Sequence, residues 1–285
     1  MSPRCIFLAS CIVVADLTGA LAVAAAPLPK RTGPREGPLG MKFVPLLKGT
    51  FYMGWDGEKG SAKKTEIKAD FEIAIHTVTQ GQWQAVMGNN PSYFSRDGGG
   101  RDMVKDIKDE DLKQFPVENV SWNDAQQFIK KLNEKETGKG WTYCLPSEAQ
   151  WEYACRGGAT TVEECSYHFY FAKPTNDLSS MEANFDGNYP FGKADKGPYL
   201  ERTTRVGSYT QNKLGLFDMH GNVWKWCSDL YEPGDEKSLA RVLRGGCWLS
   251  SSVDCRTATR RRYEPGDRYN IVGFRLAAVP DVGAK

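Results

Sequence analysis

The stretch RVLRGGCWLSSSVDCRTATRRRYEPGDRYNIVGFRLA, residues 241–277, carries the most informative pattern in the chain. It begins with a β-prone run and then turns at Gly245-Gly246, where a positive φ or a close backbone approach is sterically allowed. Two thiols follow, Cys247 and Cys255, and the stretch closes on a second apolar, strand-like run. Any chemistry of this chain is expected here, with the rest serving as scaffold.

Composition limits the fold and the partners. The chain has 285 residues, 40% of them hydrophobic, and eight tryptophans, which suffices for one large domain or two ordinary ones. The 29 glycines and 15 prolines separate many short apolar runs, a pattern that favours a loop-rich α+β fold with short strands. A net charge of +2 implies neither a nucleic-acid surface nor a strongly anionic substrate.

Three capping signals predict helices. Thr79 precedes apolar positions at helical spacing that stop at Gly88. Ser121, with an acid three residues on, predicts a helix to about Glu136, and Ser147, with a glutamine three residues on, predicts a third. The charged, glycine-rich segment 95–113 predicts a surface loop.

The first residues are typical of an export signal. Residues 1–26 hold a basic residue, an apolar alanine-rich stretch and small residues suited to cleavage near Ala24–Ala26. Asp16 interrupts this stretch, and an uncleaved membrane anchor is the alternative interpretation. We therefore expect a secreted or periplasmic protein with no membrane attachment after cleavage. A Pro/Gly-rich flexible linker is expected at 27–40.

Five blocks resemble one family in order along nearly the whole mature chain. They are Phe43–Gly54, Val78–Trp83, Pro116–Trp122, Leu145–Gly158 and Gly215–Trp224, followed by the closing stretch quoted above. The family is that of the formylglycine-generating enzyme, or sulfatase-modifying factor, and the chain resembles a diverged bacterial-type member. The resemblance implies a C-type-lectin-like fold over residues 41–280.

Active members of the family oxidise a substrate cysteine to formylglycine with copper(I) held by two cysteines. Counted forward from Gly245-Gly246, the two positions fall on Ser250 and Cys255. Counted backward from the closing strand, they fall on Cys247 and Ser252. Neither register supplies both thiols, and a serine hydroxyl is a poor ligand for a soft ion. A site built from Cys247 and Cys255 requires a bulged loop and stays open as an alternative.

The resemblance also implies calcium, a hard cation that takes oxygen ligands. Asn184 and Phe185 match the start of one family site, and Asp195 is the nearest candidate for its later carboxylate. At a second site the position of an acid is taken by Lys225, whose ammonium repels the ion and is expected to pair with Asp218.

Six cysteines remain after removal of the signal, and sequence alone leaves fifteen connectivities open. The resemblance favours a structural Cys227–Cys255 disulfide. If that bridge forms, Cys255 is unavailable to copper.

Two functions follow from these observations. In the first, the protein is non-catalytic and binds an extracellular peptide or protein in the family groove near Trp248, Ser250 and Arg275, with a sulfatase as the candidate that the resemblance implies. The alternative is a copper-dependent oxidase that modifies a sulfatase cysteine through Cys247 and Cys255. The three histidines lie at no metal-ligand spacing.

Overall fold

The computed structural model describes residues 33–235 and 238–281. The expected signal at 1–26 lies outside the described residues. Of the expected linker, residues 33–40 are described, and they contain strand β1 (Arg35–Glu36) and a 3₁₀ turn (Pro38–Gly40). Arg35 is buried and its Nε donates to Oε2 of Glu72 at 2.6 Å. This end of the segment is therefore held on a sheet.

An antiparallel five-stranded sheet forms the centre of the molecule, in the order β1-β2-β5-β13-β6. Its other strands are β2 (Lys42–Leu46), β5 (Phe71–Ala74), β6 (Trp141–Cys144) and β13 (Ala277–Pro280). Alternate side chains point to opposite faces, so Phe43 and Ala74 enter one core cluster while Val44 and Ile73 enter another. Both faces of this sheet are buried.

A second sheet of four strands has the order β11-β10-β9-β12. These strands are β9 (Trp224–Leu230), β10 (Arg241–Arg244), β11 (Arg260–Tyr263) and β12 (Val272–Phe274). The pair β9 and β12 is parallel, and the others are antiparallel. Two small ribbons complete the strands: β3 (Gly49–Met53) with β4 (Lys63–Ile67), and β7 (Phe169–Tyr170) with β8 (Pro174–Thr175).

The three predicted helices are confirmed. They are α1 (Gln80–Met87), α3 (Trp122–Glu136) and α4 (Glu148–Cys155), and each begins with a complete capping box. A fourth, four-residue helix, α2 (Asp109–Leu112), lies in the segment expected to be a loop. Within the described ranges no helix is both long and apolar enough to cross a membrane.

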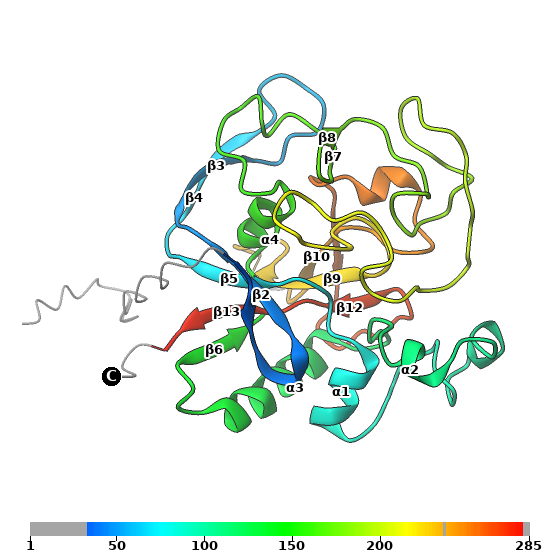
Figure 1. The fold of residues 1–285 in the computed structure, drawn as a ribbon. Helices are drawn as coiled ribbons and strands as arrows, with labels where there is room; N and C mark the ends of the chain where they lie inside the picture. The colour runs from blue at the N-terminus through cyan, green and yellow to red at the C-terminus, as the bar shows by residue number, and fades with distance from the viewer. Residues whose placement is uncertain (1–32, 236–237, 282–285) are drawn as a thin grey trace, which may run out of the picture.

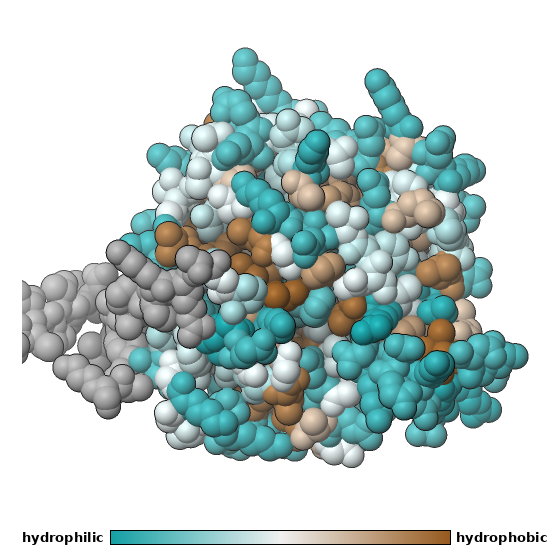
Figure 2. Space-filling view, in the orientation of Figure 1, coloured by the Kyte–Doolittle hydropathy of each residue, from teal (hydrophilic) through white to brown (hydrophobic). Residues whose placement is uncertain are grey.

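The helices cover opposite sides of the central sheet. In Figure 1, α1 and α3 lie together below the five-stranded sheet and α4 lies above it, next to β9 and β10. The α2 region at the lower right is largely hydrophilic on the face shown in Figure 2, whereas apolar side chains gather near β5 and α4. Few helices and many short strands confirm the expected loop-rich α+β class.

Candidate functional site

The two thiols of the closing stretch lie on segments that meet at Gly246. Cys247 follows β10 through Gly245 and Gly246, and Cys255 ends the 3₁₀ helix Ser252–Cys255. Both glycines have positive φ, 95° and 74°. A Cβ on Gly246 would lie 2.5 Å from Sγ of Cys255. Only glycine fits between these two segments, which is the close backbone approach that the sequence indicated.

Burial affects the ionisation of both thiols. Both side chains are buried, and burial raises the pKa of Cys247 and raises that of Cys255 well above the ordinary value. Copper(I) takes thiolates, and the thiolate is the form that burial disfavours in the metal-free protein.

Ser250 lies against the Cys247 thiol. Its Oγ accepts from the backbone N–H of Cys247 at 3.2 Å and lies 3.3 Å from the Cys247 sulfur. Cys247, Ser250 and Cys255 are all buried.

The expected Cys227–Cys255 disulfide is not formed. All six cysteines of the described residues are free thiols. Cys227 packs in the core cluster that contains Trp151, while Cys255 packs with Phe169 in a different one. The pairing fails because β9 carries Cys227 toward α4 while Cys255 lies near β7.

The three residues expected to line a groove have different positions. Trp248 is buried, and its Nε1 donates to the carbonyl of Asn270 at 3.0 Å. Arg275 is fully buried and donates to main-chain carbonyls, at 2.7 Å for Ile75. Ser250 is buried against Cys247. The placement of Arg275 on a groove does not hold in this structure, because the guanidinium is buried and bound to main-chain carbonyls in the link between β12 and β13.

The first expected calcium position holds a hydrogen-bond network. Asn184 is buried, and its Nδ2 donates to the carbonyl of Arg202 at 2.9 Å and to Oδ1 of Asn222 at 3.1 Å. The ring of Phe185 packs in the core, and Asp195 is exposed. Within the described ranges, no group of three or more His, Cys, Asp or Glu side chains is arranged to hold a metal. The amide nitrogen of Asn184 is therefore engaged in hydrogen bonds with two neighbouring segments.

The second position holds the protein's own cation. Lys225 is fully buried and its Nζ donates to the carbonyl of Gly221 at 2.7 Å. Asp218 is also buried, and its Oδ2 accepts from the backbone N–H of Gly207 at 2.8 Å. Burial lowers the pKa of Lys225 to about 7, with Arg275 lowering it further and Asp218 raising it. An ammonium thus lies where the family resemblance implies a metal ion.

Comparison with known proteins decides the family. The family model described as the sulfatase-modifying factor enzyme 1-like domain matches residues 31–279. The chain belongs to the sulfatase-modifying factor family. The resemblance seen in the sequence is confirmed.

The family relatives differ in their names. This member is 32% identical over 183 residues to the formylglycine-generating enzyme of Streptomyces coelicolor, an alignment that covers 59% of this chain and 54% of that protein. It is 32% identical over 173 residues to the inactive C-alpha-formylglycine-generating enzyme 2 of Bos taurus, covering 58% and 50%. It is 33% identical over 179 residues to the serine/threonine-protein kinase pkn1 of Chlamydia pneumoniae, covering 58% and 24%. The chain spans about a quarter of the kinase's length and about half of the other two.

Solved structures share the fold. Treponema denticola variable protein 1 matches with a TM-score of 0.63 at 25% identity, covering 86% of this chain and 98% of that one. PvdO from Pseudomonas aeruginosa matches with a TM-score of 0.64 at 24% identity, covering 88% and 100%. These likenesses support the predicted architecture.

His220 of this family member is a fixed, neutral group. Its Nε2 lies 2.9 Å from the backbone N–H of Tyr170, and its Nδ1 lies 2.7 Å from the carbonyl of Cys255. Because Tyr170 can only donate, Nε2 is the acceptor and Nδ1 carries the proton. Burial lowers the pKa of His220 to about 4, so the ring is uncharged at neutral pH. It orients the Cys255 segment and does not act as a base.

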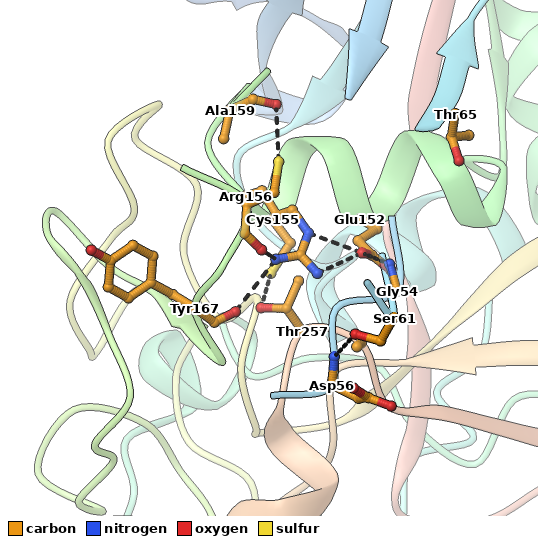
Figure 3. Close-up of polar contacts among 12 residues, drawn as sticks. Gly54, Asp56, Ser61, Thr65, Glu152, Cys155, Arg156, Ala159, Tyr167 and Thr257 are labelled. Carbon is orange, nitrogen blue, oxygen red and sulfur yellow. Dashed lines mark hydrogen bonds and ion pairs between the residues drawn. The ribbon is translucent and has the colours of Figure 1, made fainter. Parts of the chain in front are cut away.

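Sequence reasoning missed a buried ionic cluster between α4 and β10. One oxygen of Glu152 accepts from Arg156 at 2.7 and 2.9 Å and from the backbone N–H of Gly54 at 2.7 Å, as Figure 3 shows. Its other oxygen accepts from Arg244, which also donates to Glu148 at 3.2 Å. The i,i+4 spacing of Glu152 and Arg156 was the available signal. This cluster fastens the start of the closing stretch to α4.

Proposed function

We propose that this protein is an exported, non-catalytic member of the family that binds an extracellular peptide or protein, with a sulfatase as the candidate that the family name suggests. The supporting observation is the state of the closing stretch: the Cys247 thiol contacts a serine hydroxyl, Cys255 is buried, and burial raises the pKa of both thiols. A copper oxidase requires two thiolates open to the substrate. Relatives named as active and as inactive match at the same identity, so identity alone does not decide activity.

The ligand surface that we propose lies over these thiols. Leu249 is 52% exposed and Tyr189 is 62% exposed. The backbone N–H of Ser252 donates to the carbonyl of Tyr189 at 3.2 Å, which joins the two loops side by side. Val253 adds a further exposed apolar side chain. Exposed apolar residues gathered at one place indicate an interaction site. We call Tyr189, Leu249 and Val253 the apolar loop surface.

The catalytic alternative rests on one observation. Cys247 and Cys255 lie near enough for the charge of one to raise the pKa of the other. If the loop opens, these are the two sulfurs that could meet an ion.

One experiment separates the two functions. The protein lacking residues 1–26 is loaded with copper(I) and incubated with a Cys-x-Pro-x-Arg peptide. We expect no mass loss at the peptide cysteine, and mass loss that disappears in Cys255→Ser would establish the oxidase instead. Binding of the same peptide and of an unfragmented sulfatase is measured by fluorescence anisotropy.

Matched variants test the proposed surface. Leu249→Asp is expected to weaken ligand binding by about ten-fold, because it places a charge among apolar contacts. Leu239→Asp changes a similarly exposed leucine on the other side of β10 in the sequence and is the control, since Leu239 is 60% exposed. Equal binding by both variants would contradict the apolar loop surface. Sequencing of the exported protein's N-terminus tests cleavage near Ala24–Ala26.

A further inference from the structure

A pocket separate from the thiols opens beside the start of α1. It lies where β2, the connection from β5 to α1 and the segment around Val206 meet, and its volume is about 220 Å³. This is below the roughly 300–1,000 Å³ of sites for drug-sized ligands, so the pocket suits a small molecule. Its lining includes apolar side chains, among them Met41, Val78 and Val206, and polar ones, among them His76.

The imidazole of His76 is held rigidly at this pocket. Its ring stacks on that of Phe217 with the centroids 5.0 Å apart. A Cβ on Gly207 would lie 2.8 Å from Cε1 of His76, so the backbone of this glycine covers another edge of the ring. A polar side chain fixed on two sides presents its remaining edge with little loss of entropy when a ligand binds.

The surroundings of the ring decide which nitrogen carries the proton. Nδ1 of His76 is buried and has no hydrogen-bond partner among the described residues. An orphaned buried N–H is rarer in proteins than an orphaned acceptor, so the proton belongs on Nε2. With the proton on Nε2, His76 carries one N–H donor at the pocket that it lines. The hydroxyl of Thr77, which also lines the pocket, is buried without a partner and can rotate to donate.

The described lining of the pocket carries one cation and no carboxylate. Burial, followed by the charges of Arg275 and Arg205, lowers the pKa of His76 to about 4. Arg205 pairs with Asp111 at 3.4 Å, and Asp218 offsets the charge of Arg275. Lys42 pairs with the exposed Glu36 at 3.2 Å, at the surface end of the lining. A neutral donor together with this lysine attracts an acceptor that carries negative charge.

We propose that this His76 pocket binds a small organic carboxylate. The carboxylate accepts from Nε2–H of His76, with Lys42 completing the polar end. A short apolar body contacts Met41, Val78 and Val206. This site is independent of the thiol segment and of the ligand surface proposed above.

Benzoate and its neutral isostere benzamide are suitable probes. Each is titrated into the protein and followed by saturation-transfer NMR and by the Cε1–H resonance of His76. We expect benzoate to bind and benzamide to bind at least about ten-fold more weakly, because a charged acceptor strengthens the hydrogen bond. Equal binding of the two probes would overturn the proposal.

Variants place the binding in this pocket. His76→Phe keeps the stacking on Phe217 and removes the donor, so benzoate binding should be lost. His168→Phe alters a different packed histidine outside the pocket and should bind as the unaltered protein does. If His76→Phe fails to fold, Lys42→Gln supplies the test, with an expected loss of about ten-fold. Unchanged affinity in Lys42→Gln together with an unmoved His76 resonance would also refute the proposal.

Discussion

Two regions bury cations in this protein and neutralise them differently. Around α4, Arg156 and Arg244 face the carboxylates of Glu152 and Glu148. Around Gly221, Lys225 donates to a main-chain carbonyl, and its charge is only partly offset by Asp218. The first region joins charges of opposite sign, so it holds elements together. The second has an excess of positive charge, so the charge on Lys225 varies with pH.

We expect the largest change in stability when the ionic cluster around α4 loses a carboxylate. Glu152→Gln leaves two buried guanidinium groups without their main carboxylate and should lower the free energy of unfolding by about 3–5 kcal/mol. Urea unfolding followed by tryptophan fluorescence measures the change. Glu134→Gln, at an exposed position of α3, is the control and should stay within about 0.5 kcal/mol. A loss below about 1 kcal/mol for Glu152→Gln would show that the cluster does not fasten α4.

Reversing the charge at position 225 should make the stability of the protein depend on a bound cation. Lys225→Glu places a second carboxylate near Asp218 and should cost about 3 kcal/mol without a cation. Calcium is expected to restore part of this loss, which is read from the melting temperature with calcium and with EDTA. The unaltered protein should melt at the same temperature in both. A lower melting temperature of the unaltered protein in EDTA would instead support calcium at Asn184 and Phe185.

The pH response separates the two regions. Burial lowers the pKa of Lys225 to about 7, so between about pH 7 and 10.5 the unfolded chain binds the proton that the folded chain releases. Stability from this group therefore rises with pH, by at most about 1.4 kcal/mol per unit. We expect Lys225→Met to remove that rise between pH 7 and 8.5, measured as the difference from the unaltered protein. Parallel curves for the two proteins would contradict a depressed pKa.

A buried carboxylate with the opposite pH response sharpens the comparison. Glu118 accepts from the backbone N–H groups of Tyr93 and Phe94 at 3.1 and 2.9 Å, and burial raises its pKa to about 8. The folded chain thus holds a proton that the unfolded chain loses above about pH 4.5. Stability from this group is lost as the pH rises toward 8. Glu118→Gln should reduce the decrease in the free energy of unfolding between pH 5 and 8, as measured by urea unfolding. An unchanged decrease would contradict a raised pKa of Glu118.

The smallest effect concerns the thiols near Lys225. With Cys227 and Cys255 free and in separate clusters, reductant should leave the melting temperature of freshly purified protein unchanged. Mass spectrometry after alkylation under denaturing conditions should find six modified cysteines in the chain lacking residues 1–26. If reductant lowers the melting temperature by several degrees, the protein contains the disulfide that the family resemblance implies.

The sequence predicted local features better than distant contacts. The starts of three helices could be predicted because a capping box involves only four consecutive residues. These boxes begin at Thr79, Ser121 and Ser147. The sequence also predicted the turn at Gly246, because a glycine pair between two strand-like runs indicates a turn. The hydrogen-bond partners of Arg244 and Arg275 could not be predicted from the sequence. These partners come from segments that are distant in the chain and meet the arginines only in the folded core.

At the site, the sequence identified unusual residues but not their arrangement. It placed a lysine where the family has an acid, and the structure gives that lysine a carbonyl partner. It also offered two registers for the thiols. The structure puts Ser250 next to Cys247, because a three-residue turn joins the backbone N–H of Ser250 to the carbonyl of Cys247 at 3.0 Å. Such a turn depends on φ and ψ values that composition does not fix.

The position of β13 has a consequence for how the protein is made. This strand lies between β5 and β6, yet it is the last element of the chain. The ribosome makes it after every other described strand, so the middle of the sheet stays open until Ala277–Pro280 has been synthesised. A chain truncated before Ala277 should therefore be degraded or aggregate through the unpaired edges of β5 and β6.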